Sequence, residues 1–233
     1  MSKVEIIVLN EEDAKTAEAY GADRLELVSA MTEGGLTPSY GIIKTVVQSV
    51  KIPVMVMVRP HSFSFVYRND EWVAIREDIK IMKELGAAGI VFGAINNQQK
   101  VDFDMLSMVL EEAKGLSVTF HRAIDETNSL EAYQSLCHSS YKVDRILTSG
   151  GKPAAHEGLD ILKRMIEESQ KSANSPTIMP GSGLSANNIE YIHDQLHAAE
   201  YHFGSAVRID GDFSNRINGV EIEKVRKKLV NRY

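Results

Sequence analysis

Charged and imidazole side chains stand inside or at the ends of short apolar runs, where a soluble protein seldom places them unless they are paired or functional. Glu5 and Glu26 lie within such runs, and Arg59, His121 and His202 lie at or near the ends of others. A carboxylate is costly to bury without a partner, and the planar guanidinium of Arg59 suits a carboxylate or a phosphate. Two histidines beside a desolvated carboxylate can supply a general acid and a general base.

The elements that must position these residues follow from an alternation of short β-branched runs with longer amphipathic stretches. Eight such units follow one another, with expected strands at residues 4–9, 24–28, 54–58, 89–92, 117–121, 145–148, 177–179 and 201–203. Helical spacing of apolar residues predicts helices at residues 11–20, 71–85 and 157–171. This alternation predicts a parallel sheet covered by helices, either closed as a barrel or open and doubly wound.

The turn after the first expected strand decides between the two architectures. An open dinucleotide-binding sheet predicts a glycine-rich turn there, but residues 9–12, Leu-Asn-Glu-Glu, contain no glycine. Eight repeats without a linker or compositional shift therefore predict a single (β/α)8 TIM-type barrel domain over residues 1–233. In such barrels the functional groups sit at the C-terminal ends of the strands, which would gather the residues named above into one site.

Composition limits the partners. The net charge of −6 comes from scattered acids and bases without a basic stripe, so nucleic acid is not an expected partner. No apolar run approaches the roughly 18 residues of a membrane helix, so no membrane association is expected either. The single cysteine, Cys137, cannot form an internal disulfide, which favours a reducing compartment and hence the cytoplasm.

Three turns rich in small residues, at residues 29–38, 148–151 and 180–183, follow expected strands and could hold an anion. The last lies where many barrels grip a phosphate, with residues 204–205 as a possible second half. The residues expected to bind a phosphate or carboxylate there are Gly181, Ser182, Gly183 and Ser205. The alternative is a tight turn whose backbone angles need glycine.

The same polar residues also allow purely structural interpretations. Glu5, Glu26 and Arg59 could form a buried ion-pair network that only fixes the barrel interior, and each histidine could be a hydrogen-bonded core residue. Arg122 and Asp125 could pair at a helix start. The remaining histidines are expected on the solvated surface, namely His61, His138, His156, His193 and His197.

Several phrases along almost the whole chain resemble the CutC family of copper homeostasis proteins. They are residues 21–27 (GADRLEL), 33–39 (EGGLTPS), 58–60 (VRP), 119–123 (TFHRA) and 145–150 (RILTSG). The resemblance implies a TIM-type barrel, a homodimer, and a cytoplasmic role in binding or handling copper. Family members often carry cysteines two residues after the first-strand and second-strand glutamates, where this chain has Ile7 and Val28.

Three functional hypotheses follow. The resemblance implies copper binding. Because Cu(I) prefers sulfur ligands, the thioethers available near the strand ends are those of Met31, Met55 and Met57, although the ordinary interpretation of these residues is core methionine. The second hypothesis is a lyase, isomerase or hydrolase acting on a small phosphate- or carboxylate-bearing metabolite, with catalytic residues Glu26, Arg59, His121 and His202. The third is a zinc or manganese site formed by Glu5, Glu26, His121 and His202.

Overall fold

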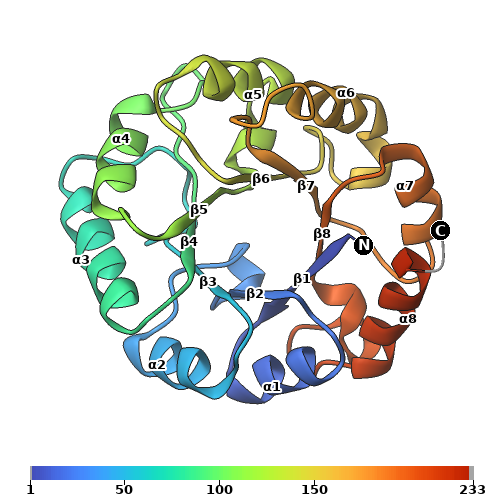
Figure 1. The fold of residues 1–233 in the computed structure, drawn as a ribbon. Coiled ribbons are helices and arrows are strands. Elements are labelled where there is room, and N and C mark those ends of the chain that lie inside the picture. Colours follow the sequence, from blue (N-terminus) through green and yellow to red (C-terminus); the bar gives the residue numbers. More distant parts are fainter. Residues whose placement is uncertain (1, 231–233) are drawn as a thin grey trace.

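Eight parallel strands form a barrel surrounded by a ring of helices, as Figure 1 shows for the computed structural model, which describes residues 2–230. The strands are β1 (Lys3–Val8), β2 (Arg24–Leu27), β3 (Val54–Met57), β4 (Gly89–Phe92), β5 (Ser117–Phe120), β6 (Arg145–Thr148), β7 (Thr177–Pro180) and β8 (Glu200–Phe203). The helices are α1 (Glu11–Ala19), α2 (Tyr40–Ser49), α3 (Glu71–Glu84), α4 (Phe103–Glu112), α5 (Ser129–His138), α6 (Leu159–Ser169), α7 (Ile189–Leu196) and α8 (Gly219–Val230). The predicted (β/α)8 barrel is confirmed, and each expected strand boundary lies within one residue of the observed one.

Short 3-10 helices shape the loops at the C-terminal ends of several strands. They are η1 (Met31–Glu33), η2 (Arg122–Glu126), η3 (Ala155–Glu157), η4 (Ser205–Val207) and η5 (Ile209–Gly211). Local signals set the ends of the longer helices. The side chain of Asn10 accepts a hydrogen bond from the Asp13 amide at the start of α1, and Gly21 after its end adopts a left-handed φ of 96°. None of the helices within residues 2–230 is long and apolar enough to cross a membrane.

The two faces of the strands differ in character. Outward-facing residues such as Ile6, Leu25 and Phe120 are fully buried and form one large apolar cluster with the helices. A separate, smaller apolar cluster lies inside the barrel, formed by Ile7, Val28, Met55, Met57 and Val91. Other inward-facing positions carry charged or imidazole groups, so the barrel interior is partly polar.

The sheet order is β7-β6-β5-β4-β3-β2-β1-β8, with every neighbouring pair parallel. β8 pairs with β1 in the register Glu5↔His202, which brings the first and last strands together. On its other side β8 packs next to β7, and the strand segments in residues 2–230 form no ladder there. The barrel thus has one seam, and the loops after β7 and β8 lie beside it (Figure 1).

Candidate functional site

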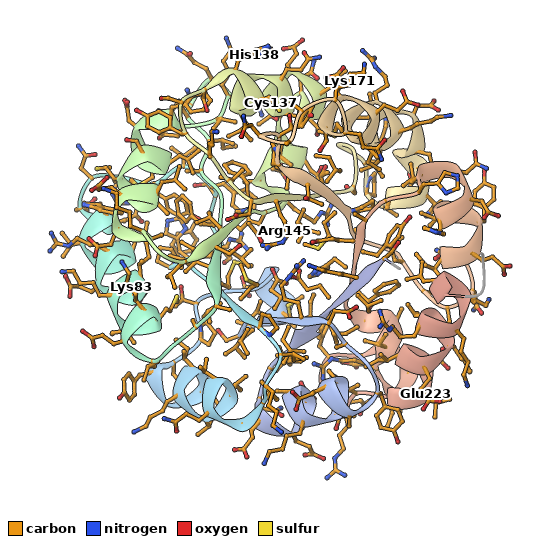
Figure 2. The ribbon with its side chains drawn as sticks, viewed as in Figure 1. Lys83, Cys137, His138, Arg145, Lys171 and Glu223 are labelled. Carbon is orange, nitrogen blue, oxygen red and sulfur yellow. The ribbon has the colours of Figure 1, made fainter. Side chains whose placement is uncertain are left out.

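A network of buried charges lies inside the barrel, below the C-terminal ends of the strands. The Nε of Arg24 donates to Glu5 Oε2, and its Nη2 donates to Glu200 Oε2 at 2.6 Å. Arg145, which Figure 2 shows at the centre of the barrel, brings its Nε to 3.1 Å from the same Glu200 oxygen. Two arginines therefore balance two carboxylates, and the partner of Glu5 is Arg24.

Arg59 does not join this network. Its Nη1 donates to the carbonyl oxygens of Glu33 and Gly35 at 3.0 and 3.1 Å, and its guanidinium stacks 4.5 Å from the ring centre of Phe65. The interpretation in which Arg59 pairs with the strand carboxylates is therefore wrong, because the loop after β2 holds this arginine through backbone carbonyls. The Arg59 Nε is buried and has no hydrogen-bond partner among the described residues.

A carboxylate–imidazole–carboxylate chain connects the ion network to the pocket above it. His202 Nδ1 lies 2.8 Å from Glu5 Oε1, and its Nε2 lies 3.5 Å from Glu26 Oε2. Burial would raise the pKa of Glu5, but Arg24 and His202 outweigh burial and lower that pKa to about 2. Burial likewise opposes the charged form of His202, yet Glu26 and Glu5 raise its pKa above the ordinary value. Carboxylates thus face both ring nitrogens and favour the imidazolium.

Glu26 is the carboxyl group of this chain that lines the pocket. Burial raises its pKa to about 7, and the attraction of His202 only partly opposes that rise. Its Oε1 is buried without a hydrogen-bond partner within residues 2–230. Glu26 therefore has one oxygen directed to His202 and the other available to a ligand.

His121, directly after β5, is held in one tautomer by the backbone. Its Nδ1 accepts a hydrogen bond from the Ala123 amide at 3.2 Å, so in the neutral ring the proton is on Nε2. Burial, followed by the charges of Arg59 and Arg122, lowers the pKa of His121 to about 3. A Cβ on Gly93 would lie 2.5 Å from Nδ1, so glycine after β4 makes room for the ring.

These groups meet in a pocket of about 270 Å³ at the C-terminal ends of the strands. Its polar lining includes Glu26, Arg59, His121 and His202. Its apolar wall includes Ile7, Val28, Met31, Met57 and Phe213. Of the proposed anion-binding residues, Ser182, Gly183 and Ser205 line the pocket, whereas Gly181 packs against Leu147 and His202. Glu5 lies outside the lining and reaches the pocket only through His202.

The three glycine-containing turns differ in whether their amides are free. In the turn at 148–151, the amides of Ser149 and Gly151 donate to the Asp125 carboxylate, each at 3.0 Å. An internal anion thus already fills that turn, and its interpretation as an external anion site is wrong. Asp125 also accepts from Arg122 Nε at 2.9 Å, which confirms the alternative that those two residues pair.

The other two turns differ in whether their backbone amides already donate hydrogen bonds. In the turn at 29–38, the amides of Gly34, Gly35 and Leu36 donate to carbonyls of the same loop. After β7, by contrast, the amides of Gly183 and Leu184 donate to no acceptor in the described part of the chain. Among the three turns, the one after β7 therefore stays the predicted anion site.

The expected metal ligands are only partly brought together. Glu5 and Glu26 each contact His202, but the described residues contain no group of three or more His, Cys, Asp or Glu side chains placed to hold a metal ion. The zinc or manganese site with His121 stays a prediction. Cys137 lies on α5 in the outer ring, far from the barrel centre in Figure 2.

Sequence reasoning missed several contributors. Arg24 and Glu200 each lie two positions before a predicted site residue on the same strand face, a signal that could have revealed them. His61 was expected on the surface, but only 13% of its side chain is exposed, and its Nε2 lies 2.8 Å from Glu71 Oε1. His193 is also half-buried, with its Nδ1 2.9 Å from the hydroxyl of Tyr201. The surface interpretation is wrong for these two histidines.

The fold and pocket define the class of this protein: a (β/α)8 barrel with a partly polar pocket at the C-terminal ends of its strands. Comparison with protein-family models matches residues 2–207 to the CutC family, and the chain belongs to that family. This confirms the resemblance seen in the sequence.

Individual relatives agree with this assignment. The CutC family protein of Enterobacter sp. (strain 638) is 42% identical over 204 residues, covering 85% of this chain and 80% of that protein. The human copper homeostasis protein cutC homolog is 37% identical over 218 residues, covering 93% and 78% of the two chains. The CutC crystal structure from Streptococcus agalactiae has a TM-score of 0.79 at 29% identity, covering 88% of this chain and 98% of that one.

Enzymes of other families share the barrel alone. Phosphoribosyl anthranilate isomerase from Thermococcus kodakaraensis superposes with a TM-score of 0.66 at 18% identity, over the full length of both chains. At this identity the likeness shows the fold and carries no functional assignment.

Proposed function

We propose that this chain takes part in copper homeostasis in the cytoplasm. Membership of the CutC family supports this, together with the name of the human relative. Ile7 and Val28 lie where the family resemblance implies cysteines, so any sulfur ligation of copper at the pocket would come from thioethers. Met31 and Met57 line the pocket, and their side chains lie near each other beside Gly35. A Cβ on that glycine would be 3.6 Å from Met31 Sδ and 3.7 Å from Met57 Cε. The homodimer implied by the family resemblance stays a prediction.

Titration of the reduced protein with Cu(I), in competition with a chromophoric chelator, tests the copper proposal. We expect the Met31→Leu/Met57→Leu variant to bind Cu(I) about tenfold more weakly or worse, because the thioethers are the soft ligands at the pocket. Cys137→Ser, which changes a thiol on the outer ring, serves as the control and should leave the affinity unchanged. Affinity at the nonspecific level in the parent protein, or loss only in Cys137→Ser, would contradict the proposal.

A second candidate function, supported by a specific observation, is an enzyme acting on a small metabolite that bears a phosphate or a carboxylate. Three buried polar atoms without hydrogen-bond partners in the described chain belong to residues lining one pocket: Glu26 Oε1, Arg59 Nε and His121 Nε2. A buried polar group left without a partner costs about 1–3 kcal/mol, so a polar ligand that contacts all three offsets a substantial penalty. The free amides after β7 can hold its anionic group, with Ser182, Gly183 and Ser205 around it.

Thermal denaturation in the presence of a library of small phosphates and carboxylates tests this second function. At a concentration 100 times its Kd, a bound anion should raise the free energy of unfolding by about 2.7 kcal/mol. We expect Glu26→Gln, Arg59→Ala and His121→Ala each to lose that stabilisation, whereas Glu223→Gln on the outer surface of α8 should retain it. A library without a stabilising anion would count decisively against this function.

A further inference from the structure

We propose that the pocket removes a proton from the carbon next to a carbonyl group, with Glu26 as the base and His121 as the hydrogen-bond donor to the carbonyl oxygen. The inference rests on the second candidate function and names its reaction. The substrate class is a short α-hydroxycarbonyl compound that carries a phosphate or a carboxylate.

His121 is built as an uncharged donor. Because its Nδ1 accepts from the Ala123 amide, the neutral ring must present an N–H at Nε2, and that atom is buried without an acceptor in the described residues. A second proton would have to bind Nδ1, where it would displace the Ala123 amide from its acceptor. A carbonyl oxygen satisfies this N–H, and the hydrogen bond strengthens as negative charge develops on that oxygen.

The carboxylate of Glu26 is the base that complements the His121 donor. Its Oε2 faces His202, which is held from below by Glu5, itself paired with Arg24. Oε1 is therefore the oxygen left for substrate. Both Glu26 and His121 line the same pocket. A base and a neutral imidazole donor on one substrate form the arrangement that enolisation requires: the base takes the C–H proton while the donor stabilises the oxyanion.

The step balances without a co-reactant. Glu26 Oε1 takes the proton, the C–H electron pair becomes the new C=C bond, and the carbonyl π pair moves onto the oxygen held by His121 Nε2–H. Return of the proton to the same carbon gives back the substrate. Its delivery to the former carbonyl carbon gives the aldose–ketose isomer, provided that the proton of the neighbouring hydroxyl group moves to the former carbonyl oxygen.

The pocket dimensions fit this substrate class. Its volume of about 270 Å³ lies just below the range of roughly 300–1,000 Å³ typical of drug-sized ligands, so it suits a metabolite of a few carbons. Val28, Met57 and Phe213 form an apolar wall of the same pocket. The free amides of Gly183 and Leu184 can hold the anionic end.

Solvent proton exchange tests the inference directly. The protein is incubated in D2O with dihydroxyacetone phosphate, ribose 5-phosphate or hydroxypyruvate, and loss of the α C–H signal is followed by proton NMR. We expect at least one probe to exchange faster than without protein, and Glu26→Gln and His121→Ala each to reduce that rate by about 100-fold or more. Glu26→Asp, which retains a carboxylate, should restore part of the rate.

Matched controls separate chemistry from folding and contamination. Glu223→Gln and His138→Gln change the same residue types on the outer ring (Figure 2), and both should exchange at the parent rate. Circular dichroism of each variant verifies the fold. Absence of exchange with all three probes, or an undiminished rate in Glu26→Gln, would overturn the inference. Anion stabilisation without exchange would leave the second candidate function standing, whereas absence of both would remove both.

Discussion

Replacing Arg24 by methionine is expected to lower the free energy of unfolding by about 3–5 kcal/mol, measured by urea denaturation at neutral pH. Arg24 is 4% exposed and pairs with Glu5 and with Glu200, both of which are buried. Methionine matches the length of the aliphatic stem but leaves two buried carboxylates without their main cation. The cost is therefore that of uncompensated charge rather than of lost packing.

Two further variants identify the cause. Arg216→Met removes an exposed arginine whose ion pair with Glu12 is open to solvent, and it should change stability by only about 0.5 kcal/mol or less. Adding Glu5→Gln and Glu200→Gln to Arg24→Met removes the unpaired buried carboxylates and should recover part of the lost free energy of unfolding. If Arg24→Met and Arg216→Met cost the same, the buried network does not stabilise the barrel as described.

The second large effect is a loss of stability as the pH rises from about 5 to about 8, which Glu26→Gln should reduce. Burial raises the folded-state pKa of Glu26 from 4.5 to about 7. The contribution of Glu26 to the free energy of unfolding is therefore fully present below pH 4.5 and is lost as the pH rises through about 7. The size of this shift corresponds to on the order of 3 kcal/mol. His202, with a raised pKa, loses its contribution in the same direction.

Other carboxyl groups do not mimic this pH dependence. The pKa of Glu5 is lowered to about 2, so its contribution is present above pH 4.5 and is lost only as the pH falls towards 2, outside the window. Thermal or urea denaturation of the parent protein, Glu26→Gln and the surface control Glu223→Gln at a series of pH values measures the effect. Parallel pH profiles for the parent and Glu26→Gln would contradict the assignment to Glu26.

The barrel could be predicted from the sequence because its requirements are local and repeated. Outward strand residues must be apolar to meet the helices, which produces a β-branched run at each unit. Glycines such as Gly21 and Gly86 end helices in left-handed conformations just before the next strand. Each of these signals is readable in a short window, and eight of them together define the architecture.

The location of the site residues could be predicted from the sequence, but their ion-pair partners could not. Glu26, His121 and His202 stand out because strand ends of a barrel face one pocket. Which groups pair depends on the register between strands, such as Glu5↔Arg24 and Lys3↔Glu200, and a single strand does not contain that information. For this reason the sequence leaves open a pairing of Arg59 with the strand carboxylates, although Arg24 holds the position next to Glu5.

The prediction of an anion site in the turn at 148–151 is wrong for a related reason. Its small residues match an anion-binding pattern, and an anion does occupy it, but that anion is Asp125 from the preceding loop. A sequence pattern describes the donors of such a turn without indicating whether the chain itself supplies the acceptor.

The pairing of β8 with β1 also has a consequence for how the protein folds. Glu5 and His202 are 197 residues apart in the sequence, and β1 is the single ladder partner of β8 among the described strands. Contacts between such distant segments form late, because loop closure must precede them. The inner strands can associate while the chain is still growing at the ribosome. The imidazole that faces Glu26, however, can take its place only after the last strand has been synthesised, so this pocket is among the final parts of the molecule to mature.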